Sequence, residues 1–296
     1  MLTRRALLGT AAAASLAAPG RADDWRVLPD GCVTADGTWL PYNVFLPSGF
    51  RRSAGRYRLL VLLHGANADE QFWAGRLRLW RAVEAAVAAG RIGPLIAVMP
   101  GSRDTWWVDS RAARAESALV RDLLADVALK YPVTAAREGR AIAGYSAGGY
   151  GALRIALKHP HLFGAAALWA PAAYAETPPP LSAARRSAAF AGEDGAFDQE
   201  AWRRAAWPAL LPAYVAQRLR VPMFIAAGEV DPLGIAGEAM RLGLTLGATQ
   251  PGLVALRFVE AGHTMRVWEE TVDEALEFLF GGQGQSPHPI DVAAAR

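Results

Sequence analysis

Hydrophobic positions along the chain form short apolar runs that alternate with segments of helical periodicity. The apolar runs are bounded by glycine and proline, as strands are, and lie at 39–46, 59–63, 95–99, 141–143, 164–169, 221–226 and 253–259. Apolar residues three or four positions apart predict helices at 79–89, 115–130, 147–158, 237–246 and 267–280. Alternating strands and helices predict an α/β fold, with a mostly parallel central sheet covered by helices on both faces.

Two segments depart from this alternation. Residues 172–218 contain three consecutive prolines, an acidic turn and tryptophan-containing helical stretches. We interpret them as an insertion over the carboxyl ends of the strands, forming a lid or cap; an ordinary surface excursion is the alternative. Residues 282–296 are rich in glycine, proline and glutamine and are expected to form a flexible tail. Residues 23–281, insertion included, are expected to form one domain.

The first 22 residues have the character of an export signal. Arg4 and Arg5 precede a run of small and apolar residues, and Gly-Arg-Ala at 20–22 resembles a cleavage site. The paired arginines match a twin-arginine signal; a disordered or anchoring helix is the alternative. No other stretch reaches the roughly 18 uncharged apolar residues of a membrane span. We therefore predict an exported protein, periplasmic or extracellular, without stable membrane insertion.

Composition narrows the class of protein. The 296 residues are 52% hydrophobic and 20% charged, which excludes an intrinsically disordered chain. The single cysteine excludes a disulfide framework and a multi-cysteine metal cluster. The formal charge of +3 resides in the first 22 residues, because the rest of the chain holds 28 basic and 28 acidic residues. With no dense basic run, nucleic acid is not an expected partner.

Residues 141–149, Ala-Ile-Ala-Gly-Tyr-Ser-Ala-Gly-Gly, carry the strongest chemical signal. They place Ser146 in a G-x-S-x-G motif between a short apolar strand and an apolar helix. A sharp turn there strains the serine and lifts its hydroxyl above the sheet, while Gly144 and Gly148 remove side chains that would collide. Ser146 is therefore the predicted nucleophile. The alternative is a tight glycine turn with an incidental serine.

A serine nucleophile needs a histidine base, which follows it along the chain in folds of this kind. The downstream histidines are His159, His161, His263 and His288. We select His263, because it lies on a glycine loop between a late strand and a helix. His159 and His161 end a helix, where histidines usually cap carbonyls, and His288 lies in the tail.

The base in turn needs a carboxylate that fixes its tautomer and stabilises the imidazolium. Asp231 lies at the carboxyl end of the strand at 221–226, in a turn that Pro232 terminates. Glu229, two residues earlier, is the competing acid. An aspartate before proline is also a common turn former. We select Asp231 as the orienting acid.

An oxyanion hole needs two amide donors. One is expected from Ala147, directly after the nucleophile. The second is expected from the loop after the strand at 59–63, where Gly65 allows close approach of the backbone and Ala66 is the chosen donor. His64 is expected to orient this loop rather than to act as a base.

Together these pieces resemble the α/β-hydrolase fold and, more narrowly, the esterase D-like group, which includes feruloyl and acetyl esterases, S-formylglutathione hydrolases and mycolyltransferases. The resemblance is densest at 140–170, with its G-x-S-x-G-G-x-x-A-L run and His-Pro-x-x-Phe segment, and extends over about 39–280. It implies serine-dependent acyl transfer to water without cofactor or metal. Two features differ from the group's pattern, since the Ala66 loop lacks extra glycines and Thr-Met-Arg follows His263.

Three aromatic residues are expected to bind substrate. The resemblance includes Trp106 and Trp107, which follow the strand at 95–99 and are expected to line the pocket; core or loop packing is the alternative. Tyr145, next to the nucleophile, is the third.

The predicted function is that of an exported serine esterase acting on a small-molecule or carbohydrate-linked ester. An acyltransferase would use the same triad with a sugar or lipid alcohol as acceptor. A non-catalytic binding module on this scaffold, or a serine peptidase, are further alternatives. The export signal argues against S-formylglutathione hydrolase, a cytosolic activity.

Overall fold

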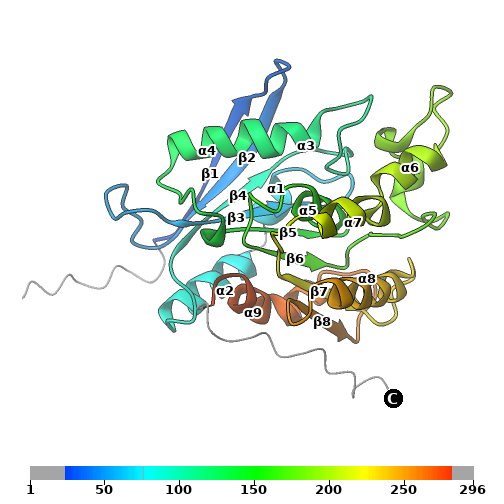
Figure 1. Ribbon diagram of the computed structural model, residues 1–296. Helices are drawn as coiled ribbons and strands as arrows, with labels where there is room; N and C mark the ends of the chain where they lie inside the picture. The colour runs from blue at the N-terminus through cyan, green and yellow to red at the C-terminus, as the bar shows by residue number, and fades with distance from the viewer. Residues whose placement is uncertain (1–23, 76, 282–296) are drawn as a thin grey trace, which may run out of the picture.

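The computed structural model describes residues 24–75 and 77–281. The expected export signal and the expected tail lie outside these residues. A single eight-stranded sheet runs through the described molecule in the order β1-β2-β4-β3-β5-β6-β7-β8 (Figure 1). The strands are β1 Arg26–Val33, β2 Trp39–Leu46, β3 Arg58–Leu63, β4 Leu95–Pro100, β5 Arg140–Tyr145, β6 Ala165–Trp169, β7 Met223–Gly228 and β8 Val254–Val259. β1, β2 and β4 pair antiparallel, and every pair from β4 to β8 is parallel.

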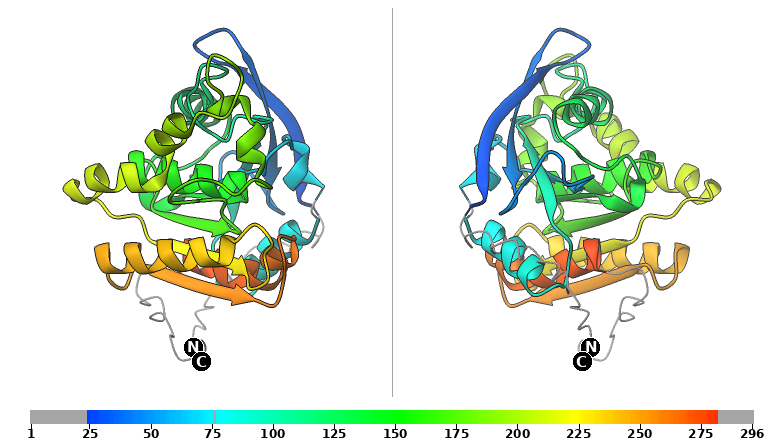
Figure 2. Two further views of the ribbon diagram at one scale, coloured as in Figure 1. Left: turned by 90° about the vertical axis from the view of Figure 1, so that its right-hand side faces the viewer. Right: turned by 90° about the vertical axis from the view of Figure 1, so that its left-hand side faces the viewer.

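Helices cover both faces of this sheet (Figure 2). The α-helices are α1 Gln71–Ala74, α2 Leu77–Ala88, α3 Ala115–Ser117, α4 Leu124–Lys130, α5 Ala147–Lys158, α6 Gln199–Ala205, α7 Trp207–Ala216, α8 Ile235–Thr249 and α9 Arg266–Phe280. α5 contacts β3, β5 and β6, whereas α9 contacts β5 to β8 and packs beside α2. Because α5 and α9 cover the same two strands, β5 and β6, they lie on opposite faces. The predicted α/β fold is confirmed.

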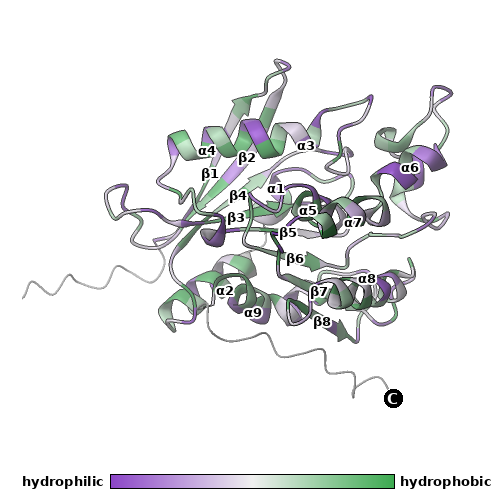
Figure 3. Ribbon diagram, viewed as in Figure 1, coloured by the Kyte–Doolittle hydropathy of each residue, from purple (hydrophilic) through white to green (hydrophobic). Residues whose placement is uncertain are grey.

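The central strands form the core because they are apolar along their whole length. Every residue of β4, β6 and β7 is buried, and Figure 3 shows the sheet as mostly hydrophobic. A parallel strand with helices on both faces has no solvent side, so its sequence shows a continuous apolar run and not an alternation. The seven strands predicted from such runs are all present.

Two features of the fold differ from the sequence prediction. β1 was not predicted, because Pro29, Asp30 and Gly31 interrupt it and it is an edge strand with several exposed residues. The helix predicted at 115–130 is present as α3 and α4, joined by a π-helical segment, η1 Ala118–Leu123. The spacing of apolar residues does not distinguish a π-helical turn from an α-helix, so the sequence could not predict this segment.

The insertion at 172–218 contains the 3₁₀ turns η3 Ala183–Arg186 and η4 Ala188–Phe190 together with α6 and α7. It is fastened to α5 by aromatic packing. Trp202 stacks on Tyr150, with ring centroids 5.2 Å apart, and Phe190 and Trp106 meet these rings edge to face. Tyr150 also donates a hydrogen bond to the carbonyl of Ala205 (3.1 Å). Within the described residues, the helices are all too short or too polar to cross a membrane.

Candidate active site

The turn between β5 and α5 holds Ser146 in a conformation that few side chains adopt. Its backbone has φ 57° and ψ −116°. Glycine is required on both sides. A Cβ on Gly144 would lie 2.3 Å from the backbone of Gly148, and a Cβ on Gly148 would lie 2.2 Å from the carbonyl oxygen of Leu63. Such strain commonly marks a functional residue, and it lifts the hydroxyl above the carboxyl ends of the strands.

Three side chains from distant parts of the chain meet at this turn. Ser146 Oγ lies 2.9 Å from His263 Nε2, and His263 Nδ1 lies 2.7 Å from Asp231 Oδ2. An ionised carboxylate only accepts hydrogen bonds, so His263 Nδ1 carries the proton and donates to Asp231. Nε2 is then the lone-pair nitrogen that accepts the hydrogen bond of the Ser146 hydroxyl. In this tautomer, the lone pair of His263 Nε2 faces the Ser146 hydroxyl.

The loops after β7 and β8 hold Asp231 and His263. The Asp231 side chain is fully buried, and its second oxygen, Oδ1, accepts from the amide of Leu233 (2.9 Å). Gly228, at the end of β7, lets the two loops approach, since a Cβ there would lie 2.2 Å from the carbonyl of Ala261. The His263 side chain is 20% exposed, so its ring is accessible from solvent.

The competing residues lie elsewhere. Glu229 is exposed, and Asp231 is the carboxylate that contacts His263. His159 does not cap a carbonyl with its ring, as was expected; the ring contacts Glu116, with Nε2 3.0 Å from Oε1. His161 is exposed beside it. His288 lies outside the described residues.

The two amides expected as oxyanion donors belong to the residue after Ser146 and to a loop that approaches Ser146. Ala147 begins α5, so its amide has no partner within the helix. Gly65 lies against the nucleophile, because a Cβ built on it would be 3.6 Å from Ser146 Cβ. Ala66 follows at once, and its amide donates to no other backbone group among the described residues. Two unused amides beside a serine hydroxyl are the arrangement that stabilises a developing oxyanion.

His64 stabilises this loop through hydrogen bonds of its ring. It is buried, with Nδ1 2.7 Å from the carbonyl of Gly65, and Nε2 accepts the amide of Ser102 (2.9 Å). The Gly65 carbonyl can only accept, so Nδ1 is protonated and the ring is neutral. Burial lowers the pKa of His64, which agrees with this state. The Ser102 amide could not be found from sequence, because backbone donors carry no residue signal.

The tryptophan pair that was expected at the pocket is buried. Trp106 and Trp107 are each 2% exposed. Trp107 donates from Nε1 to the carbonyl of His64 (3.1 Å) and packs over Gly151 of α5, and Trp106 joins the aromatic cluster of the insertion. Both are packing residues that hold the loop after β4 against α5. Tyr145 is also mostly buried, but its ring lies 5.3 Å from that of His263.

Comparison with known proteins identifies the family. The profile of the "Putative esterase" family matches residues 37–279, which is most of the chain. The chain belongs to this esterase family. "Esterase Rv1288" of Mycobacterium tuberculosis is 32% identical over 128 residues, which are 41% of this chain and 27% of that protein. The "Endo-1,4-beta-xylanase/feruloyl esterase" of Xylanibacter ruminicola is 30% identical over 131 residues, 41% of this chain and 18% of that protein. The matched part of this chain thus spans about a quarter or less of the length of these curated relatives.

Solved structures confirm the α/β-hydrolase fold of this esterase family member. A ferulic acid esterase superposes with a TM-score of 0.71 at 22% identity, covering 87% of this chain and 98% of that one. An S-formylglutathione hydrolase of Staphylococcus aureus gives 0.65 at 17% identity, covering 86% and 98%. At these identities the likeness extends to the fold alone.

Proposed function

We propose that the chain hydrolyses carboxylic esters through an acyl-enzyme, with Ser146 as nucleophile, His263 as base and Asp231 as the acid that orients the base. The observation that carries the proposal is the continuous hydrogen-bonded relay from Ser146 Oγ through His263 to Asp231. A strained serine in line with a histidine and a buried carboxylate is the arrangement that activates a hydroxyl. Membership of an esterase family supports an ester as the substrate.

In the first half of the proposed reaction, Ser146 Oγ attacks the ester carbonyl carbon while His263 Nε2 takes the hydroxyl proton. The carbonyl oxygen becomes an oxyanion, and the amides of Ala147 and Ala66 donate to it. One such donor contributes a factor of about 10²–10³ to kcat. The bond to the alcohol oxygen then breaks, and His263 gives its proton to the departing alcohol.

In the second half, water attacks the acyl-enzyme with His263 again as base. The tetrahedral intermediate collapses, the acid leaves, and Ser146 recovers its proton from His263. Asp231 keeps Nδ1 protonated throughout, so Nε2 always faces the reacting oxygen. Water is the proposed acyl acceptor, and the partial exposure of His263 to solvent supports this choice.

We also propose a substrate class. We expect a small-molecule or carbohydrate-linked ester met outside the cytoplasm, consistent with the sequence of the first 22 residues. Relatives and structural neighbours named as feruloyl or ferulic acid esterases support this range.

The deciding experiment compares hydrolysis of p-nitrophenyl esters, from acetate to laurate, by wild type and Ser146→Ala. The variant should lose at least about 10⁴-fold in kcat, whereas the control Ser53→Ala, at an exposed serine, should match wild type. The longest ester turned over gives the size of the acyl site. Equal turnover by wild type and Ser146→Ala would refute the mechanism and leave a binding role.

A further inference from the structure

A second concave site lies next to the proposed oxyanion loop. It is a groove of about 920 Å³. Four segments form its walls: the β1–β2 hairpin at 34–41, the segment 67–70, the loop 101–105 after β4, and residues 112–118. Ser146, His263 and Asp231 are not among the lining residues, so the groove is separate from the triad. Asn67, which lines the groove, directly follows Ala66 in the chain, so the groove adjoins the loop that carries the proposed oxyanion donor.

The hairpin contributes an exposed indole to this groove. Trp39 is 59% exposed, which is rare for a tryptophan outside a binding surface. One side of the ring is supported, since a Cβ on Gly31 of the neighbouring strand would lie 2.1 Å from it. The glycine therefore makes room for the ring to lie against β1. The remaining surface of the ring is a flat apolar platform at the edge of the groove.

Polar groups with unused hydrogen-bonding capacity lie in the same groove. Within the described part of the chain, the side chains of Asn67 and Arg103 form no hydrogen bond or ion pair. An amide donates and accepts, and a guanidinium donates. The charged lining residues are Asp36, Asp69, Glu70, Asp104, Arg103 and Arg114. Four carboxylates against two guanidiniums make the groove acidic, which disfavours a polyanionic ligand.

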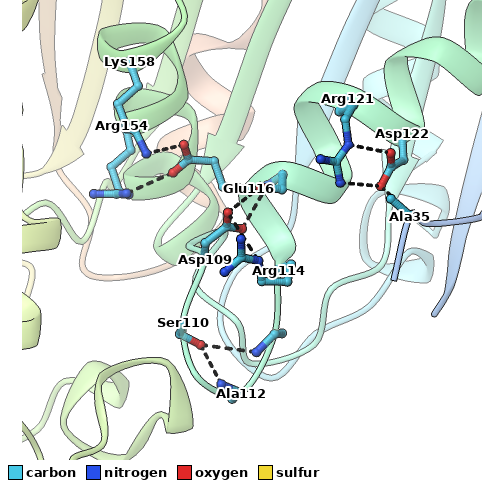
Figure 4. A network of polar contacts seen from close by, with 12 residues as sticks. Ala35, Asp109, Ser110, Ala112, Arg114, Glu116, Arg121, Asp122, Arg154 and Lys158 are labelled. Atoms are coloured by element: carbon cyan, nitrogen blue, oxygen red, sulfur yellow. Dashed lines mark hydrogen bonds and ion pairs between the residues drawn. The ribbon is translucent and has the colours of Figure 1, made fainter. Parts of the chain in front are cut away.

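The walls are tied to one another, so the groove is present before a ligand binds. The amide of Gly101 donates to the carbonyl of Pro41 (2.9 Å), and Asn43 Nδ2 donates to the carbonyl of Glu70 (2.9 Å). On the far side, the amide of Ala35 donates to Asp122 Oδ2 (3.0 Å), which joins the hairpin to η1 (Figure 4). A preformed site loses little conformational entropy on binding.

Hydrogen bonds and an ion pair also hold the segment at 109–117 in place. Ser110 Oγ accepts the amide of Ala112 (3.1 Å), and Asp109 Oδ1 accepts the amide of Ser117 (3.0 Å). Glu116 forms an ion pair with Arg154 of α5 (3.0 Å), as Figure 4 shows. The wall of the groove is thereby connected to α5, the helix that follows Ser146.

We propose that this groove binds a neutral sugar chain that carries the ester. The proposal rests on the proposed function of the triad. A sugar ring presents an apolar C–H face that fits a flat indole, and hydroxyls that both donate and accept hydrogen bonds to amide, guanidinium and carboxylate groups. A chain bound there continues past Asn67 toward the Ala66 amide, where the ester carbonyl is held.

The test compares a small ester with sugar esters. Wild type should hydrolyse acetylated cellotetraose, xylotetraose or mannotetraose with a higher kcat/KM than p-nitrophenyl acetate. Trp39→Ala should lower the ratio of these two values about tenfold, equivalent to about 1.4 kcal/mol, mainly through KM. Trp39→Phe should restore most of the ratio. Val33→Ala, at an exposed position of the same hairpin outside the groove, should leave the ratio unchanged.

A second variant keeps the test valid if Trp39→Ala unfolds the hairpin. Arg103 has φ 46°, and asparagine tolerates this conformation, so Arg103→Asn removes the guanidinium without disturbing the loop. It should also lower the ratio. The matching unacetylated tetrasaccharide should inhibit hydrolysis of the sugar ester and not of p-nitrophenyl acetate.

Two negative results have different meanings. If hydrolysis depends on Ser146 but neither variant changes the ratio, and no tetrasaccharide inhibits, the groove proposal is overturned and the esterase mechanism stands. If Ser146→Ala retains full hydrolysis of p-nitrophenyl acetate, the proposed function itself fails. Inhibition of both substrates by the tetrasaccharide would place sugar at the triad and not in the groove, and would also overturn the proposal.

Discussion

At the scale of single residues, His64 links the loop of the proposed oxyanion donor Ala66 to the loop after β4. Its two nitrogens hold the Gly65 carbonyl and the Ser102 amide, while its own carbonyl accepts from Trp107 Nε1. With the Gly65 carbonyl turned toward His64, the next amide, that of Ala66, is left free for an oxyanion. Such a residue acts through the backbone and need not touch the substrate.

Replacing His64 by alanine should therefore affect turnover more than substrate binding. We expect kcat for p-nitrophenyl acetate to fall about 10- to 100-fold, less than for deletion of an oxyanion donor, with little change in KM. His161→Ala removes an exposed histidine and serves as the control. Steady-state kinetics on variants shown to be folded by circular dichroism would decide. A rise in KM at unchanged kcat would contradict the positioning role.

Residues differ in how far their place can be predicted from sequence. The relation of Ser146 to its glycines is local, so the motif alone predicts a strained turn between strand and helix. The positions of His263 and Asp231 follow from the order of strands, because parallel strands end at one edge of the sheet. The burial of Trp106 and Trp107 depends on Tyr150, Phe190 and Trp202, which come from other segments. No local pattern distinguishes such packing from a pocket wall.

At the scale of elements, the insertion is attached to α5 through an aromatic cluster. Trp202 of α6 is fully buried and contacts Tyr150, Phe190 and Trp106. Trp207 of α7 donates from Nε1 to the carbonyl of Ala173 (3.0 Å), at the start of the insertion. A segment held this way shares the stability of the helix beneath it. The proline-rich start of the insertion suggested a cap. The aromatic packing that fixes this segment could not be predicted from the sequence.

Trp202→Ala should thus destabilise the whole domain. Removing a fully buried tryptophan leaves a cavity and costs about 3–5 kcal/mol in the free energy of unfolding. Leu181→Ala, at a 69% exposed position in the same insertion, should change it by less than about 0.5 kcal/mol. Urea unfolding followed by tryptophan fluorescence measures both. If Trp202→Ala lost less than about 1 kcal/mol, the insertion would be an independently moving element.

At the scale of the whole molecule, the sequence predicts the strands of the sheet better than it predicts grooves that several loops form together. Apolar runs identify the buried strands one at a time, since each run is a local property. The groove is built from four segments that are far apart in sequence, and one of them, at 34–41, takes its place through the pairing of β2 with β1, which the sequence did not reveal. Its key residue, Trp39, is unremarkable in sequence, because it is the pairing of β1 with β2 that lays its ring over Gly31.

A buried charge cluster joins α3 to α5. We expect it to make the free energy of unfolding depend on pH in the acidic range. Glu116 is almost fully buried and contacts Arg154, Lys158 and His159. Burial alone would raise its pKa, but the hydrogen bond from His159 and the charges of Arg154 and Lys158 outweigh burial and lower the pKa to about 2. In the unfolded chain the ordinary value of 4.5 returns. Between these values the unfolded chain binds more protons than the folded one.

Stability contributed by Glu116 is consequently complete above pH 4.5 and is lost as the pH falls through about 2. The difference between the two pKa values corresponds to about 3 kcal/mol. Glu116→Gln should be less stable than wild type at pH 7, because Arg154 and Lys158 lose their buried partner. Its free energy of unfolding should then fall less steeply between pH 4.5 and pH 3. Urea unfolding at a series of pH values, with Glu193→Gln at an exposed ion pair as the control, tests this. Parallel loss of stability in wild type and Glu116→Gln across that interval would show that other carboxylates govern the acid response.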